Sequence, residues 1–304
     1  MDRREFLKTV GSAAAAAALG FGNVPRAFAA AAEASMAPDM VAVRNGEPAA
    51  LVDAAIAAMG GMGRFVKRGQ TVTVKPNIGW AVAPELGANT NPAVVKRVIE
   101  HCLDAGAKKV YVFDNSCDSW RLSYSASGIE SVAKAAGAEV VPPASEGLYQ
   151  SVTLRGSKTL GVVKVHELVL SSDVLINVPV LKHHGGAGMT AALKNYMGMV
   201  WDRNAFHRKG LDACIAEASL ARKADLTIVD MYRVMKTGGP RGNPSSQREL
   251  LKMLIASVDP VAADAASARA LGFDPASFGY IAGAERLGLG VSSLEKLDVR
   301  RIVL

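Results

Sequence analysis

The chain has 304 residues, of which 50% are hydrophobic, 6% aromatic and 21% charged, with a formal net charge of +7 at pH 7. This length and apolar content suffice for one large globular domain with a sizeable core. The basic residues are spread along the chain without a block of five or six, and aromatic residues are few, which argues against a nucleic-acid partner.

The first 29 residues have the pattern of a twin-arginine signal peptide. Arg3-Arg4 precede the apolar run Val10–Phe21, which is too short to span a bilayer, and Ala27-Phe28-Ala29 matches a cleavage site. We therefore expect the twin-arginine translocation machinery to export the protein to the periplasm or another extracytoplasmic compartment. An uncleaved N-terminal anchor is the alternative. Cleavage would remove four basic and two acidic residues and leave a formal charge of +5.

Residues 30–39 are expected to form a flexible leader, and residues 40–304 a single α/β domain. Apolar strands separated by single helices predict a mainly parallel sheet with helices on both faces. Two lobes with a boundary near residues 142–156 are the alternative. Strands are expected at residues 40–43, 71–75, 109–113, 138–141, 225–229, 250–257 and 299–304, and helices at 49–59, 92–105, 128–136, 187–200, 210–222, 261–271 and 275–287.

Two expected helices begin with the same signature. Asn91-Pro92 and Asp259-Pro260 each place a capping side chain before a proline at the first helical position. The middle of the chain is less regular: residues 151–154 and 161–165 alternate like a small antiparallel insertion, and residues 168–181 contain a buried strand. No later apolar run reaches the roughly 18 residues of a membrane-spanning helix, so no stable transmembrane segment is expected.

The three cysteines, Cys102, Cys117 and Cys214, form no C-x-x-C pair. The sequence therefore has no local signature of an iron–sulfur cluster or a structural zinc site. Cys102 and Cys214 fall in expected helices and are interpreted as small buried residues. The glycine patterns of dinucleotide-binding folds and P-loops are also missing, which argues against nicotinamide and nucleoside triphosphate ligands.

The most informative segment is an apolar strand that ends in Lys182-His183-His184 and continues into a loop with Gly185, Gly186 and Gly188. A strand that leads into a tight loop and a helix N-terminus directs backbone N–H groups to one point, which is typical of an anion site. Adjacent strand residues point to opposite faces, so the three side chains cannot all serve one site. We interpret Lys182 and His183 as functional and His184 as a packing residue.

Polar residues follow the ends of several expected strands. The carboxyl ends of parallel strands meet at one edge of a sheet, where ligands bind, so these residues are expected to converge on one crevice. They are Lys75 and Asn77, Asp114 and Asn115, Lys182 and His183, Asp230, and Ser257 with Asp259.

Some of these residues suit acid–base chemistry. Thr190 and Lys194 are four residues apart and are expected to share one helix face. A lysine in a dry, cationic surrounding has a lowered pKa and suits proton transfer, with a solvated Lys194 as the alternative. His207 is an acid–base candidate, or a metal ligand together with His183. The expected catalytic residues are Lys182, His183, Lys194 and His207.

A second group is expected to bind an anion or a cofactor. Lys75 would meet a phosphate or carboxylate as a point charge, unless it is a solvated residue at a strand end. The loop 238–242 would close over the ligand with Arg241 as a clamp, unless it is an ordinary surface loop. By position alone, Asp114 and Asp230 are the carboxylates that would hold a metal ion. The expected binding residues are Lys75, Asn77, Gly185, Gly186, Gly188, Thr190, Asn195, Gly238, Gly239 and Arg241.

Nine motifs are distributed over most of the chain: Lys75–Asn77, Thr90–Pro92, Leu175–His183, Met189–Gly198, His207, Ile228–Asp230, Gly238–Pro240, Ala256–Asp264 and Gly288–Gly290. As a set they resemble the domain-of-unknown-function family 362, whose activity is generally not established. Many members carry ferredoxin-like cysteine motifs. This chain has none, so the resemblance does not imply an iron–sulfur cluster here, and a metal ion or a small anionic cofactor stays open. The layout is also distantly similar to the lactate racemase family, which uses a nickel-pincer nucleotide.

These patterns predict an exported α/β enzyme with a crevice that binds a small anion or cofactor. Its expected chemistry is a proton-transfer or redox step on a small carboxylate or carbonyl compound. One alternative is a non-catalytic periplasmic protein that captures a small anion. Another is an accessory protein with an exported redox partner.

Overall fold

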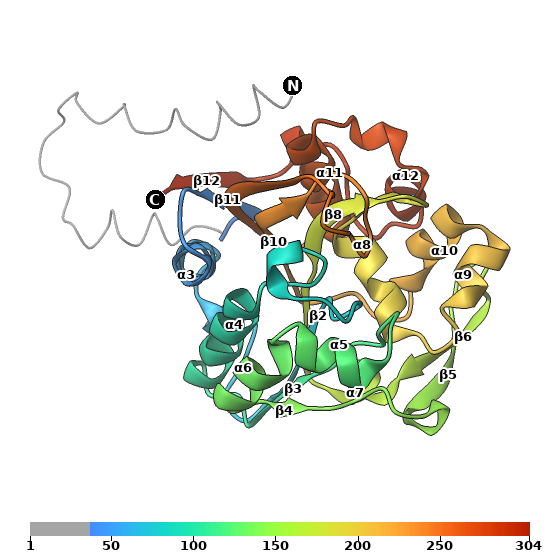
Figure 1. Cartoon of the computed structure of the whole chain (residues 1–304), viewed down its shortest axis with the longest axis horizontal. Coiled ribbons are helices and arrows are strands. Elements are labelled where there is room, and N and C mark those ends of the chain that lie inside the picture. Colours follow the sequence, from blue (N-terminus) through green and yellow to red (C-terminus); the bar gives the residue numbers. More distant parts are fainter. Residues whose placement is uncertain (1–36) are drawn as a thin grey trace, which may run out of the picture.

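The structure is a computed structural model that describes residues 37–304. The expected signal peptide and residues 30–36 of the expected leader lie outside the described residues. The described chain forms a mixed, mostly parallel ten-stranded sheet and a separate two-stranded sheet (Figure 1). The strands are β1 (Met40–Arg44), β2 (Thr71–Pro76), β3 (Lys109–Val112), β4 (Glu139–Val140), β5 (Tyr149–Thr153), β6 (Val162–His166), β7 (Val174–Val178), β8 (Val180–His184), β9 (Gly188–Thr190), β10 (Leu226–Met235), β11 (Arg248–Ser257) and β12 (Val299–Val303).

The main path through the large sheet runs β12-β1-β11-β10-β7-β2-β3-β4, and β8 extends it between β10 and β9. Neighbouring strands are parallel except where β11 meets β1 and β10, and where β9 meets β8. The small β5–β6 sheet is antiparallel, as the alternating pattern of residues 151–165 predicted. The expected α/β class is therefore confirmed.

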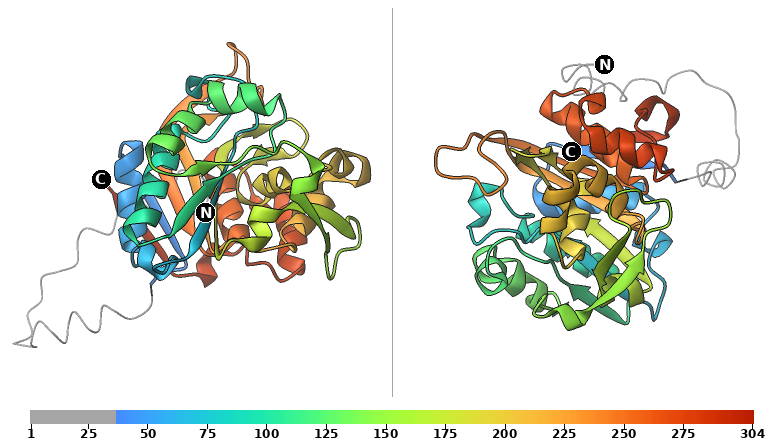
Figure 2. Two further views of the ribbon diagram at one scale, coloured as in Figure 1. Left: turned by 90° about the horizontal axis from the view of Figure 1, so that it is seen from below. Right: turned by 90° about the vertical axis from the view of Figure 1, so that its right-hand side faces the viewer.

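Helices cover both faces of the large sheet, as expected (Figures 1 and 2). Alternate residues of a strand point to opposite faces, so Val41 packs with one core cluster and Ala42 with the other. α3, α4 and α6 pack on the Val41 face, and α8, α10, α11 and α12 on the Ala42 face. The helices are α3 (Pro48–Ala58), α4 (Pro92–Asp104), α5 (Trp120–Ala126), α6 (Ile129–Ala135), α7 (Glu167–Ser171), α8 (Ala192–Asn195), α9 (Asn204–Lys209), α10 (Leu211–Ala218), α11 (Pro260–Leu271) and α12 (Gly279–Arg286). No helix within residues 37–304 is long and apolar enough to cross a membrane.

Both expected proline-containing helix starts are confirmed. The side chain of Asn91 accepts a hydrogen bond from the backbone N–H of Ala93 at 2.9 Å at the start of α4. Asp259 accepts from the N–H groups of Val261 and Ala262 at 2.8 and 2.9 Å at the start of α11. These bonds satisfy backbone donors that a helix leaves unpaired at its first turn.

The helix expected over residues 187–200 is wrong. The structure has β9, then the single turn α8, then the 3-10 turn Tyr196–Met199. Gly188 has a φ of +74°, which lets the chain reverse and pair β9 antiparallel with β8. In this register Thr190 lies opposite Lys182. A long-range strand pairing therefore overrides the local helical pattern.

Other differences are smaller. The helix expected over residues 275–287 is broken at Phe278, and only α12 is α-helical. β10 continues beyond Asp230 to Met235, so Asp230 does not lie at a strand end. The loop that joins β10 to β11 projects from the body of the molecule (Figure 2). The short helices α5 and α9 were not expected from the sequence.

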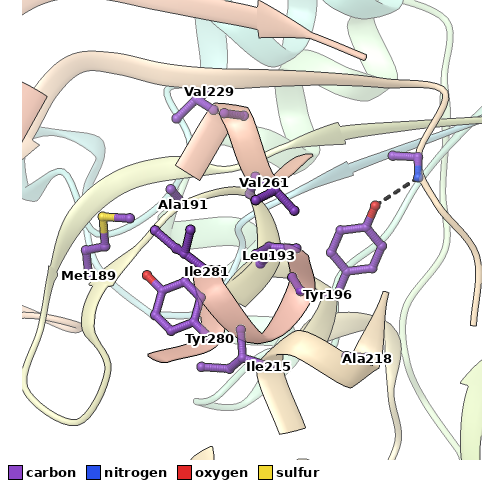
Figure 3. Packing of buried hydrophobic residues seen from close by; sticks show 14 of the residues in the cluster. Met189, Ala191, Leu193, Tyr196, Ile215, Ala218, Val229, Val261, Tyr280 and Ile281 are labelled. Atoms are coloured by element: carbon purple, nitrogen blue, oxygen red, sulfur yellow. Dashed lines mark hydrogen bonds between the residues drawn. The ribbon is translucent and has the colours of Figure 1, made fainter. Parts of the chain in front are cut away.

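Contacts at both ends of the single turn α8 fix its position. Leu193 and Tyr196 belong to the hydrophobic core, and the Tyr196 hydroxyl accepts a hydrogen bond from the backbone N–H of Ala224 at 2.8 Å (Figure 3). The buried carboxylate of Asp264, on α11, accepts from the N–H groups of Ala192 and Leu193 at 2.6 and 3.1 Å. A four-residue helix has little stability of its own, so these contacts position it.

We expect Asp264→Ala to lower the free energy of unfolding by about 2 kcal/mol or more, because it leaves two buried N–H groups without acceptors. Urea denaturation measures this change. The control is Asp274→Ala, which removes the cap of an exposed 3-10 turn and should cost about 1 kcal/mol or less. Equal losses in the two variants would contradict the role assigned to Asp264.

Candidate functional site

A cavity of about 660 Å³ opens beside the carboxyl ends of β2, β3 and β8. This volume lies within the range of small-molecule sites. The expected residues that line it are Lys75, Asn77, Asp114, Asn115, Lys182, Thr190, Lys194, Asn195 and His207. Residues more than 130 positions apart in the chain therefore meet at one edge of the sheet, as the parallel arrangement predicted.

Ser257 and Asp259 do not take part in this convergence. β11 runs antiparallel to its neighbours, and Ser257 lies opposite Thr227 of β10 and Met40 of β1. These are the starts of the two neighbouring strands, so the carboxyl end of β11 lies at the other edge of the sheet. The expectation that all polar strand ends meet is wrong for this strand.

Lys75 and Asp114 form a buried ion pair at the base of the cavity. The Lys75 Nζ lies 2.6 Å from Asp114 Oδ1, and both side chains are at most 3% exposed. Lys75 also donates to the carbonyl of Pro76 and to Asn195 Oδ1, each at 2.9 Å. Burial lowers the pKa of Lys75, and Asp114 opposes that shift. The alternative of a solvated lysine is wrong. All three ammonium protons of Lys75 already have acceptors, so Lys75 positions the site rather than offering the expected free charge to an anion.

Gly198 makes this pair possible. A Cβ at position 198 would collide with Asp114 Oδ1 and lie 2.7 Å from Lys75 Nζ. Only glycine therefore fits where the 3-10 turn crosses the ion pair. The second carboxylate oxygen of Asp114 accepts from the backbone N–H of Ile78 at 2.6 Å, which fixes its orientation.

Amide side chains connect the ion pair to the rest of the cavity. Asn195 Oδ1 accepts from Lys75 and from Asn77 Nδ2, and Asn195 Nδ2 donates to Asn177 Oδ1 at 2.8 Å. Asn77 Oδ1 in turn accepts from Lys182 Nζ at 3.1 Å. Asn77 and Asn195 thus orient the two lysines. These hydrogen bonds restrict the positions of the side chains that they connect.

Lys182 is 1% exposed and keeps one direction of its amine open. Its Nζ donates to Asn77 Oδ1 and to the carbonyl of Ala88. Burial is the main cause that lowers the pKa of Lys182 to about 7, with smaller contributions from Lys194 and Lys75. A lysine with this pKa is half neutral at pH 7.

Lys194 is 8% exposed, and its ammonium has only the thioether of Met197 as a hydrogen-bond partner in the described chain, at 3.1 Å. A thioether is a weak acceptor. Burial, together with Arg203 and Lys75, lowers the pKa of Lys194 to about 8. The expectation of a dry, cationic surrounding is confirmed, and the alternative of a solvated lysine is wrong. Thr190 lies on β9 rather than on the same helix, but it also lines the cavity.

The two adjacent histidines are placed differently from the expectation. His184 lines the cavity, and His183 does not. Residues 182 and 184 share one face of β8, whereas His183 points away and its Nδ1 accepts from the backbone N–H of Gly239 at 3.1 Å. His207, on α9, is exposed at the rim of the cavity, and burial, Lys194 and Arg203 lower its pKa.

The glycine loop does not line the cavity. The N–H of Gly186 donates to His184 Nδ1, and the N–H of Gly185 donates to the carbonyl of Gly239 at 3.3 Å. Gly188 allows the turn into β9, where a Cβ would collide with Phe278. These N–H groups are directed at protein atoms, so the expected backbone nest for an anion at Gly185, Gly186 and Gly188 is not formed.

The loop 238–242 approaches the site only through Pro240, which lines the cavity. Gly239 packs so closely on the backbone of His183 that a Cβ would collide with it, and a Cβ on Gly238 would collide with Ser246. Arg241 is exposed and pairs with Asp118 at 3.3 Å. Gly238, Gly239 and Arg241 therefore shape and hold this loop.

Asp230 also lies away from the cavity. Its carboxylate accepts from the backbone N–H groups of Asn91 and Tyr232 at 2.8 and 2.9 Å, so it ties β10 to the start of α4. Burial raises the pKa of Asp230 to about 6. Asp114 is bound to Lys75. Among residues 37–304, no group of three or more His, Cys, Asp or Glu side chains is placed to hold a metal ion.

Several lining residues were not expected from the sequence. Arg203 donates to Cys117 Sγ at 2.5 Å and to the carbonyl of Asn115, and it adds a cation to the three lysines of the cavity. Trp80 and Trp201 supply aromatic walls. No local pattern marks Arg203 or Gly198, because both act through contacts distant in sequence. Cys102 and Cys214 are buried in α4 and α10, as expected.

We expect Gly198→Ala to break the Lys75–Asp114 pair and lower the free energy of unfolding by about 3–5 kcal/mol, the usual cost of disrupting a buried pair. The matched control is Gly63→Ala, where a Cβ meets nothing within 4 Å, and it should change stability by about 0.5 kcal/mol or less. Chemical denaturation of both variants measures the difference. A Gly198→Ala protein as stable as the control would contradict this account.

The chain is similar in sequence to a known protein family and to a named relative. A family model described as Domain of unknown function (DUF362) matches residues 72–269. Thylakoid-associated protein sll1697 of Synechocystis sp. is 31% identical over 250 residues, which are 78% of this chain and 74% of that protein.

Two solved structures are more distant. The lactate racemase apoprotein from Thermoanaerobacterium thermosaccharolyticum has a TM-score of 0.41 and 11% identity over 64% of this chain. A protein from Thermotoga maritima has a TM-score of 0.46 and 14% identity over 74% of this chain. The matches span 50% and 59% of those two chains. The family model and the identity to the Synechocystis protein show that this chain belongs to the DUF362 family.

Proposed function

We propose that this protein is an enzyme that moves a proton on a small carboxylate compound that also carries a carbonyl group. The proposal rests on the pair of buried lysines, Lys182 and Lys194, which line one cavity and to which no carboxylate of residues 37–304 is bound. Of the reaction types expected from the sequence, proton transfer is the one that a lysine with a pKa near 7 supports.

Lys182 is the proposed base. A neutral amine has two N–H groups and one lone pair. Asn77 and Ala88 accept two hydrogen bonds from Nζ, and the remaining direction has no partner among residues 37–304. The lone pair of neutral Lys182 therefore has a fixed direction, and the side chain lines the cavity. Fixed geometry and a pKa near the working pH are the two requirements of an efficient general base.

Lys194 is the proposed anion contact. Its pKa of about 8 leaves it mostly charged at pH 7, and its only polar partner in the described chain is a thioether. Thr190 is 3% exposed and lines the same cavity, and its hydroxyl has no hydrogen-bond partner in residues 37–304. A carboxylate would bind to both. When Lys182 takes a proton from the carbon beside the carbonyl, negative charge develops on the substrate, and Lys194 and Arg203 stabilise it.

A non-catalytic anion-binding protein is the second candidate. It is favoured by the three cations Lys182, Lys194 and Arg203, which hold an anion whether or not a proton moves. The two candidates differ in what Lys182 must do. A binder needs its charge, whereas an enzyme needs its neutral form.

To separate them, the protein is incubated in D₂O with a panel of small 2-oxo acids, and NMR follows exchange of the proton beside the carbonyl. We expect exchange with the wild type and a loss of at least about 100-fold in Lys182→Gln. The control is Lys223→Gln, at an exposed surface position. Binding without exchange for every acid tested would favour the non-catalytic candidate.

Anion affinity should also depend on pH. Lys182 and Lys194 lose their protons at about pH 7 and 8, so both are charged below pH 7 and largely neutral above pH 9. We expect the affinity for oxalate to fall as pH rises from 6 to 9. Proton abstraction needs neutral Lys182 and charged Lys194, so kcat/KM should be bell-shaped with a maximum between the two pKa values. Calorimetry and initial rates measure the two profiles.

Lys194→Gln should weaken oxalate binding by about 10- to 100-fold, because it removes a charged hydrogen bond worth about 1.5–3 kcal/mol. Isothermal titration calorimetry at pH 6.5 measures the affinity. Lys223→Gln again serves as the control and should bind as the wild type does. An unchanged affinity in Lys194→Gln would contradict the proposed anion contact.

We also propose that the protein acts outside the cytoplasm after twin-arginine export. The Arg3-Arg4 pair and the apolar run that follows it support this location. The related Synechocystis protein is named for its association with thylakoids. A fusion of residues 1–36 to a reporter that is active only after export should be exported in the wild-type form. The Arg3→Lys, Arg4→Lys double variant should stay inside the cell.

A further inference from the structure

His184 presents one defined ring nitrogen to the cavity. It ends β8 on the same face as Lys182, and it lies opposite Gly188 of β9 in the strand pairing. The register therefore places this imidazole beside the proposed base, with no side chain facing it on the neighbouring strand.

The glycine loop fixes the tautomer of this ring. His184 Nδ1 accepts hydrogen bonds from the backbone N–H groups of Gly186 and Ala187, both at 3.1 Å. A nitrogen that accepts hydrogen bonds carries no proton, so the neutral ring must carry its proton on Nε2. Nε2 has no hydrogen-bond partner among residues 37–304. The ring therefore has one free N–H donor, whose direction the loop sets.

The surroundings keep His184 uncharged. Burial is the largest cause that lowers the pKa of His184 to about 3, with smaller contributions from Lys194, Lys182, His207 and His183. Protonation would place a third positive charge beside two buried lysines and would also break both bonds to Nδ1. The imidazole thus stays neutral throughout the pH range in which the lysines titrate.

We propose that His184 is a neutral hydrogen-bond donor that binds an oxygen atom of the ligand through Nε2–H. The inference rests on the proposed function, because it assigns this contact to the carboxylate or carbonyl oxygen of the same ligand. A fixed donor selects an acceptor oxygen and disfavours a ligand group that is itself a donor. Because the ring does not protonate, it polarises the oxygen without competing with Lys182 for the proton.

This assignment also gives the glycine loop a purpose. Two of its N–H groups hold the imidazole, and the imidazole contacts the ligand in their place. Gly186 lies directly against the ring: a Cβ there would lie 3.6 Å from the His184 Cε1 atom. At this distance a Cβ would be in ordinary van der Waals contact with the imidazole.

Two substitutions separate the two nitrogens. The side-chain oxygen of asparagine lies about where Nδ1 does, so His184→Asn keeps an acceptor for the loop and loses the Nε2 donor. The side-chain nitrogen of glutamine lies about where Nε2 does, so His184→Gln keeps the donor and loses the acceptor. We expect His184→Asn to melt as the wild type does but to bind oxalate about tenfold more weakly, which is the loss of one hydrogen bond. His184→Gln should melt at a lower temperature and retain more affinity than His184→Asn.

A measurement without substitution makes the inference independent of binding. ¹⁵N NMR of histidine-labelled protein should show an unprotonated Nδ1 and a protonated Nε2 for His184, unchanged from pH 5 to 9. A protonated Nδ1, a titration of this ring in that range, or wild-type oxalate affinity in His184→Asn would overturn the inference. Failure of the wild type to bind any small carboxylate would instead overturn the proposed function, and the NMR spectrum would still decide the tautomer.

Discussion

The contact between Lys75 and Asp114 determines how the other charges of the cavity are distributed. It joins the end of β2 to Asp114, two residues beyond β3, and, through Asn195, to α8. A buried charge without a partner is far more costly than a buried pair, so this contact keeps the base of the cavity closed and electrically balanced. Lys182 and Lys194 have no equivalent carboxylate partner within residues 37–304. The protein thus neutralises one buried lysine completely and leaves two for a ligand. The amides of Asn77 and Asn195 connect Lys75 to Lys182 through hydrogen bonds.

Much of the fold follows from local signals. Apolar runs placed the strands, and the two proline-containing caps placed the starts of α4 and α11, because a capping side chain acts on N–H groups two or three positions away. The meeting of Lys75, Asp114 and Lys182 at one cavity followed from the parallel arrangement alone. The same rule failed for Ser257, since no feature of its own segment reveals that β11 runs against its neighbours.

The residues that sequence reasoning misplaced depend on contacts distant in the chain. The segment 187–200 has a helical pattern, yet pairing with β8 makes its first part a strand. The pairing of Lys75 with Asp114 and the fit of Gly198 over that pair lie outside any local window. His184 is different. The two-residue period of a strand puts positions 182 and 184 on one face, so the alternation already present in the sequence favoured His184 over His183 as the partner of Lys182.

The position of α8 links folding to binding. Leu193 and Tyr196 face the hydrophobic core (Figure 3). Lys194 and Asn195, within the same turn of chain, line the cavity. Like charges in a poorly solvated cavity repel one another and destabilise the ligand-free protein, and a bound anion reduces this repulsion. Occupancy of the cavity then strengthens the native state by mass action. Substitutions that raise the stability of the ligand-free protein and substitutions that raise its affinity for an anion therefore act on the same few residues in opposite directions.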